Sequence, residues 1–147
     1  MPYKHILVPT DGSARSKRAI RAAVELAQKF NARLTALYVL GEGVPTLFSG
    51  DKLYDSGVIA PKYRAAARKI AADALLVAER AAKAAGVRHT SARARARAPW
   101  IAIVRAAQAR HCDLIVMAAH GKRGLTALGS QTIKTVAHTH IPILVCR

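Results

Sequence analysis

The segment between Asp113 and Ser130 constrains the fold most. Its unbroken apolar run, Leu114–Ala118, predicts a buried central strand. A basic loop with three glycines follows, and a helix is expected to begin near Ser130. Glycine lets backbone N–H groups approach an anion closely, and the start of a helix adds the positive end of its dipole. A strand, a glycine loop and a helix start in this order predict a phosphate cradle.

Strand-like and helix-like segments alternate along the rest of the chain. Strands are expected at His5–Val8, Arg33–Leu40, Val87–Ala98, Asp113–Ala118 and Ile141–Cys146. Helices are expected between Ser13 and Asn31, from Pro61 to about Ala85, from Pro99 to about Arg110, and from Ser130 to about Thr139. Residues 41–60, rich in glycine, predict a loop that folds over a nearby site. This alternation predicts one α/β domain over residues 1–147, with helices on both faces of a parallel sheet.

Each helix carries an apolar stripe that we expect to face the sheet. The stripes are Ile20, Val24, Ala27 and Phe30; Ile70, Ala74, Val77 and Ala81; Ile103 and Ala107; and Ile133, Val136 and Ala137. In the third strand, four alanines (92, 94, 96 and 98) share one face and three arginines (93, 95 and 97) the other. Charge on one face is typical of an edge strand, because it discourages pairing with another sheet.

The charge of the chain is strongly positive, with a formal net value of +16. Clustered Lys and Arg would suggest nucleic-acid binding, because they neutralise phosphates. Here the basic residues are spread over most segments, and few aromatic residues accompany them. We therefore expect a solvated basic surface with nonspecific affinity for polyanions, and no dedicated nucleic-acid partner.

Several classes of protein are disfavoured by what the sequence lacks. No apolar run is long enough to cross a bilayer, and a strand follows the N-terminal Met almost at once, which predicts a cytoplasmic protein without a signal peptide. Cys112 and Cys146 form no CxxC pair and are expected to be reduced, semi-buried thiols. The six histidines show no zinc spacing, so no metal site is expected.

The chain resembles the universal stress protein family over essentially its whole length. The resemblance rests on five segments: Ile6–Ser13, Asp113–Met117, His120-Gly121, Gly129-Ser130 and Ile141–Val145. It implies an open five-stranded parallel sheet in the order 3-2-1-4-5. Strand 3 then lies at an edge, in agreement with its arginine pattern.

ATP-binding members of that family carry the loop signature Gly-x2-Gly-x9-Gly-Ser/Thr after strand 4. The matching positions here are Ala118, Gly121, Gly129 and Ser130. Alanine thus replaces the first glycine, and only seven residues separate Gly121 from Gly129. The added methyl crowds a ribose or phosphate, and the shorter loop alters the cradle. Two alternatives stay open: a protein that binds ATP, and a relative that works through protein contacts without a nucleotide.

By this resemblance, a binding site is expected where strands 1 and 4 lie side by side. Pro9, Thr10 and Asp11 would line the adenosine side, Val39 would contact adenine, Met117 and Ala118 would border the ribose, and His120, Gly121, Gly129, Ser130 and Gln131 would surround the phosphates. The winding of the sheet also reverses at this point, where open α/β sheets bind ligands. Each polar residue has a simpler interpretation, since Asp11 and Ser130 can serve as helix caps and His120 as an ordinary loop residue.

The leading functional hypothesis is a stress-response protein that acts by binding ATP or a related adenine nucleotide. No nucleophile–base pair or paired carboxylates are evident, so we do not expect an enzyme, and any ATP hydrolysis would be slow. Mg²⁺ would accompany the phosphates, with Asp11 as the nearest acidic residue. The family resemblance also implies a homodimer through strand 5, at Ile143, Leu144, Val145 and Cys146. A polyanion-binding module is the third hypothesis.

Overall fold

A computed structural model describes residues 3–41, 60–119 and 129–147 of the chain. These residues form a five-stranded sheet in the order β3-β2-β1-β4-β5, and every neighbouring pair is parallel. The strands are β1 (His5–Pro9), β2 (Arg33–Gly41), β3 (His89–Ala96), β4 (Leu114–Ala118) and β5 (Ile143–Cys146). The helices are α1 (Ala14–Phe30), α2 (Ala60–Ala84), α3 (Pro99–Ala109) and α4 (Ser130–Ala137). The predicted fold class and strand order are confirmed, whereas the expected loop within 41–60 and the two site residues His120 and Gly121 lie outside the described residues.

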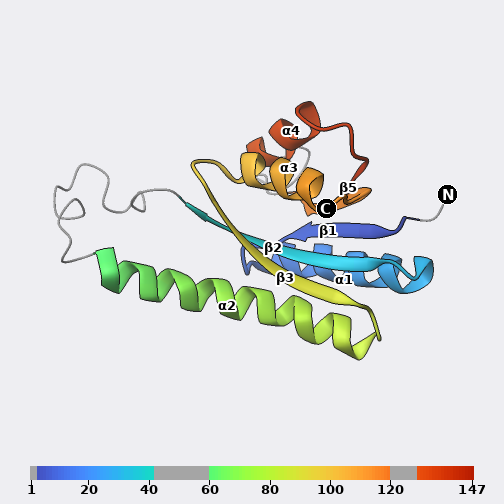
Figure 1. The fold of residues 1–147 in the computed structure, drawn as a ribbon, viewed down its shortest axis with the longest axis horizontal. Coiled ribbons are helices and arrows are strands. Elements are labelled where there is room, and N and C mark those ends of the chain that lie inside the picture. Colours follow the sequence, from blue (N-terminus) through green and yellow to red (C-terminus); the bar gives the residue numbers. More distant parts are fainter. Residues whose placement is uncertain (1–2, 42–59, 120–128) are drawn as a thin grey trace.

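Helices cover both faces of the sheet, as the alternating sequence predicts. Helices α1 and α2 lie on one face and α3 and α4 on the other (Figure 1). Strand β1 supplies both cores, because Ile6 and Val8 pack towards α1 and α2 while Leu7 packs towards α3. All three side chains are fully buried. This two-sided burial explains why Ile6, Leu7 and Val8 form an unbroken apolar run.

The limits of the helices follow from the residues that cap them. Ser13 precedes α1, and its hydroxyl accepts a hydrogen bond from the Ser16 N–H. Asn31 ends α1 in the left-handed conformation, with φ of 55°. Gly86 follows α2 with φ of 69°, and the next residue, Val87, donates back to the Ala82 carbonyl at 2.9 Å. The sequence correctly predicted all three boundaries.

The core stripe of α2 was predicted wrongly in part. Ile70 is 55% exposed, and Val77 and Ala81 are only half-buried. Ala74 is buried as predicted, and the other buried residues of α2 are Ala71, Leu75, Ala78 and Ala82. A Cβ atom placed on Gly12 would lie 3.4 Å from the Ala74 Cβ, so α2 approaches the turn after β1 closely. Small side chains permit this approach, and the bulkier Ile70 is turned to solvent.

The face of α4 that meets the sheet was also predicted wrongly. Ile133 and Val136 are 53% and 50% exposed, and Ala137 is exposed, whereas Thr132 and Thr135 are buried. The threonine hydroxyls are satisfied locally, because Thr132 donates to the Ala118 carbonyl at 3.3 Å and Thr135 to the Gln131 carbonyl at 2.7 Å. Burial therefore leaves no unpaired hydroxyl, and the apolar side chains of α4 face outward.

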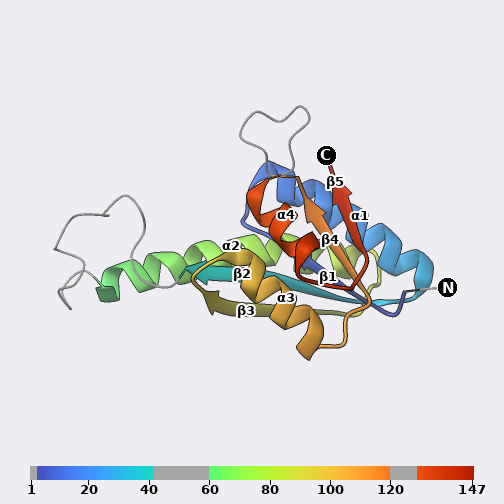
Figure 2. The same cartoon turned by 90° about the horizontal axis from the view of Figure 1, so that it is seen from above.

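The two edges of the sheet are β3 and β5, as expected (Figure 2). Arg93, Arg95 and Arg97 are exposed beside half-buried or buried alanines, which confirms the edge pattern. Strand β5 begins at Ile143, two residues later than expected, because Pro142 has no N–H to donate to a ladder. Within the described part of the chain, no helix is long and apolar enough to cross a membrane.

Candidate functional site

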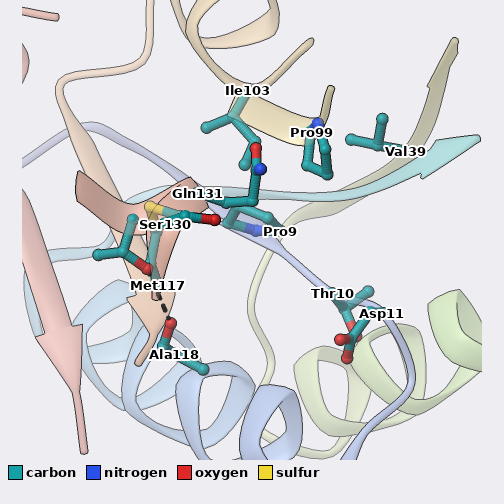
Figure 3. Close-up of a pocket in the computed structure, with 11 residues that line it drawn as sticks. Pro9, Thr10, Asp11, Val39, Pro99, Ile103, Met117, Ala118, Ser130 and Gln131 are labelled. Atoms are coloured by element: carbon teal, nitrogen blue, oxygen red, sulfur yellow. Dashed lines mark hydrogen bonds between the residues drawn. The ribbon is translucent and has the colours of Figure 1, made fainter. Parts of the chain in front are cut away.

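A cavity of about 300 Å³ opens at the carboxyl ends of β1 and β4. Its lining residues come from β1 and the turn after it, β2, α3, β4 and α4: Pro9, Thr10, Asp11, Val39, Pro99, Ile103, Met117, Ala118, Ser130, Gln131 and Thr132 (Figure 3). Eight of these were expected in a binding site, and a ninth expected residue, Gly129, is buried directly before α4. The structure thus gathers most of the predicted residues around one hollow at the point where the sheet reverses its winding.

The turn after β1 is held by a compact hydrogen-bond network. The Thr10 N–H donates to the Leu37 carbonyl at 2.9 Å, which extends the pairing of β1 with β2. The Asp11 carboxylate accepts from the Ser13 N–H at 2.9 Å and from the buried Ser16 hydroxyl. Gly12 adopts a positive φ of 83°, which the sharp turn requires. Asp11 therefore stabilises the turn, as its simpler interpretation predicts, while also lining the cavity.

One wall of the cavity is apolar. This wall is formed by Val39 from β2 and by Pro99 and Ile103 from α3 (Figure 3). Ile103 belongs to the same core as Leu7. From the sequence, Pro99 is expected only to begin a helix and Ile103 only to lie in the core. Their position relative to β3 was a usable signal, because residues that follow the carboxyl end of a parallel strand lie at the ligand-binding edge.

The opposite end of the cavity is formed by β4 and the start of α4. Ala118 is buried at the end of β4. Its carbonyl accepts a hydrogen bond from the Thr132 hydroxyl, and this bond fixes α4 to the sheet. Gly129 occupies the N-cap position, and its lack of a side chain leaves capping to other groups. Ser130, the first residue of α4, is exposed and lines the cavity. The first N–H groups of a helix have no partner within it, so this end of α4 suits an anion.

Helices α3 and α4 are joined beside the cavity by two contacts. The Gln131 Oε1 accepts a hydrogen bond from the backbone N–H of Trp100 at 3.1 Å. The Trp100 ring stacks on the His138 ring, with centroids 4.2 Å apart and planes inclined by 29°. His138 is itself oriented by a hydrogen bond from Nδ1 to the Lys134 carbonyl at 2.7 Å. These contacts fix the wall that carries Pro99 and Gln131. No local pattern in the sequence indicates this role of Trp100.

The described lining residues carry no cationic side chain, so an anion held here would rely on the backbone N–H groups at the start of α4. Asp11 is the acidic residue among the described lining residues. Burial of Tyr38, together with the negative charge of Asp11, raises the pKa of the Tyr38 hydroxyl. In the described ranges, no group of three His, Cys, Asp or Glu residues could hold a metal ion. Cys112 and Cys146 are free thiols, and burial raises the pKa of Cys112 to about 11.

Comparison with known proteins identifies the family. A sequence model of the universal stress protein family matches residues 2–147. A universal stress protein of Thermus aquaticus is 35% identical over 150 residues, which cover 99% of both chains. The chain belongs to the universal stress protein family. This match confirms the family that the sequence segments suggested, and with it the expected fold.

Two further relatives extend the comparison. A universal stress protein of Methanocaldococcus jannaschii is 32% identical over 152 residues, covering 99% of this chain and 82% of that protein. A crystal structure of a universal stress protein in complex with cAMP superimposes with a TM-score of 0.69 and 26% identity, covering 100% of this chain and 98% of the other. That relative therefore binds a cyclic adenine nucleotide.

Proposed function

We propose that this universal stress protein binds ATP or a related adenine nucleotide in the cavity between β1 and β4, and acts in the cytoplasm by binding. The observation that carries this proposal is the pairing of an apolar wall with a helix start in one cavity of about 300 Å³. Apolar surfaces suit a flat base, and helix N-termini suit phosphates. The similar protein in complex with cAMP supports the same class of ligand.

Each part of the ligand has a matching part of the cavity in this proposal. Val39, Pro99 and Ile103 would pack on the base, and Pro9, Thr10 and Asp11 would border the adenosine. Met117 and Ala118 would border the ribose, and Gly129 and Ser130 would face the phosphates. His120 and Gly121, which the family resemblance assigns to the phosphates, lie outside the described residues.

The lining favours binding over catalysis. None of the described lining residues is a histidine, lysine or cysteine, so Asp11 is the one candidate base among them and no strong nucleophile is present there. Asp11 would supply one oxygen to a Mg²⁺ ion carried in with the phosphates, since this ion is commonly held by one or two carboxylates. Any hydrolysis of ATP at this site would be slow and incidental.

Isothermal titration calorimetry with ATP tests the proposal. Ser130→Glu places a carboxylate at the start of α4, where it favours the helix but repels phosphates. We expect ATP binding about tenfold weaker, with no loss of thermal stability. Ser91→Glu, on the exposed edge strand β3, changes the net charge equally and should bind ATP as the parent protein does. Equal binding by both variants, or no binding by the parent protein, would refute the proposal.

A second candidate function is favoured by Ala118. Its methyl group stands where ATP-binding relatives carry glycine, and it lines the cavity. The loop that follows is also two residues shorter than the signature of those relatives. A protein that works through protein contacts without a nucleotide would show this pattern. Titration of the parent protein with ATP distinguishes the two functions directly.

We further propose that the protein forms a homodimer through β5. The last helix and last strand expose three large hydrophobic side chains: Ile133, Val136 and the 40% exposed Leu144. Ile143, Val145 and Cys146 are half-buried along the same strand. Leu144→Asp should convert the dimer to a monomer in size-exclusion chromatography with light scattering. Leu76→Asp, at a comparably exposed leucine of α2, should leave the dimer intact. A persistent dimer in Leu144→Asp would contradict this interface.

A further inference from the structure

The side-chain amide of Gln131 has a fixed orientation. Helix α3 begins at Pro99, and its N-cap residue Ala98 has no polar side chain to cap the helix. Gln131 of α4 provides the missing acceptor, since its Oε1 takes the Trp100 N–H at 3.1 Å. A backbone N–H can only donate, so the amide oxygen must face α3. The NH₂ group then occupies the other branch of the amide.

This NH₂ group belongs to a residue that lines the cavity. Figure 3 shows the Gln131 amide beside Ile103, at the apolar wall that also contains Pro99 and Val39. Among the described residues, no acceptor bonds to the Gln131 Nε2. An amide NH₂ carries two donors, and its loss of water on ligand binding favours an acceptor on the ligand. The surrounding apolar side chains offer none.

The position of the amide is reinforced from behind. Trp100, whose N–H holds the Gln131 oxygen, stacks on His138 at 4.2 Å, so α3 and α4 meet at two separate points. A donor held by such contacts loses little conformational entropy when a ligand arrives. Preorganised donors of this kind contribute to selectivity, because a ligand without the matching acceptor leaves them unpaired.

From this geometry we propose that Gln131 is a specificity-determining residue that donates a hydrogen bond from Nε2 to a ring nitrogen of the bound base. The inference rests on the proposed nucleotide function and adds to it a side chain that recognises the base. It places Gln131 at the base, whereas the family resemblance placed it among the phosphates. Adenine offers three unprotonated ring nitrogens, N1, N3 and N7, and Gln131 would bond to one of them.

The test compares AMP with its 1-deaza, 3-deaza and 7-deaza analogues by calorimetry, in the parent protein and in Gln131→Glu. Glutamate can accept the Trp100 N–H but cannot donate when ionised. We expect one analogue to bind the parent protein about fivefold more weakly than AMP, and to bind Gln131→Glu as tightly as AMP does. All ligands carry the same phosphate, so repulsion by the new charge cancels in this comparison.

Thermal unfolding separates this role from a merely structural one. Gln131→Glu should be at least as stable as the parent, because a carboxylate caps the start of α3 as well as the amide does. Gln131→Met should lose both stability and base selectivity. If every analogue differs from AMP by the same factor in both proteins, Gln131 does not read the base, although the proposed nucleotide function stands. If the parent protein binds neither AMP nor ATP, both proposals fail.

Discussion

Removal of the Asp11 carboxylate should destabilise the fold by a predictable amount. In Asp11→Ala, the Ser13 N–H and the buried Ser16 hydroxyl each lose an acceptor. Hydrogen bonds to charged groups contribute roughly 1.5–3 kcal/mol each, but Asp11 itself is exposed and water can replace part of the interaction. The two losses together should lower the free energy of unfolding by about 2 kcal/mol. For a chain of this length, that corresponds to a fall in Tm of roughly 6 °C.

Differential scanning calorimetry measures this effect, and Asp11→Asn serves as the matched control. Asparagine keeps one carbonyl oxygen for the Ser13 N–H, so it should lose about half as much stability as alanine. The comparison also separates the two roles of Asp11. If Asp11 only holds the turn, the variant that loses more stability should also lose more ATP affinity, in the order Asp11→Ala before Asp11→Asn. A Tm within about 1 °C of the parent in Asp11→Ala would show that the network does not stabilise the turn.

Three further predictions concern single side chains. Burial, with a smaller contribution from Arg33, lowers the pKa of His5 below 6.5, so the unfolded chain takes up a proton first. The free energy of unfolding should therefore fall as the pH drops below 6.5. Urea denaturation at pH 7 and pH 5 measures this loss, which should be smaller in His5→Gln than in the parent protein. Substitution of the exposed His140 should leave the loss as large as in the parent. The Cys112 thiol, with its pKa of about 11, should react with a thiol reagent at pH 7.5 only after denaturant is added, and rapid labelling of the native protein would contradict its burial. Ala118→Gly should bind ATP more tightly than the parent protein in calorimetry if the methyl group crowds the ligand, and unchanged affinity would show that it does not.

The fold was predictable because its signals are local and repeated. The continuous apolar run of β4, the arginine alternation of β3 and the capping residues Ser13 and Gly86 each specify one element without reference to the others. Parallel sheets built from such alternating elements allow few topologies. The strand order itself came from the family resemblance, and the structure confirms it.

The helix faces were less predictable, because burial depends on partners distant in sequence. Ile133 is exposed and Thr132 buried because the threonine hydroxyl finds the Ala118 carbonyl, 14 residues earlier. Ile70 is exposed because α2 approaches the sheet through alanines. Hydrophobicity gives no information on either contact.

The candidate site was predictable in its location and incomplete in its composition. Residues at the ends of β1 and β4 were found from the resemblance and from the reversal of winding. Pro99 and Ile103 were missed as lining residues, since each has a sufficient structural role in the sequence. The link between Gln131 and Trp100 joins two helices that are 31 residues apart at this point, and no local pattern reveals it.

We propose that an adenine nucleotide occupies the cavity between β1 and β4. NMR chemical-shift mapping of the ¹⁵N-labelled protein during titration with AMP tests it most directly. We expect saturation at one equivalent, with the largest amide shifts on Thr10, Val39, Met117, Gly129 and Ser130. Shifts confined to the arginines of β3, or no shifts at millimolar AMP, would contradict it.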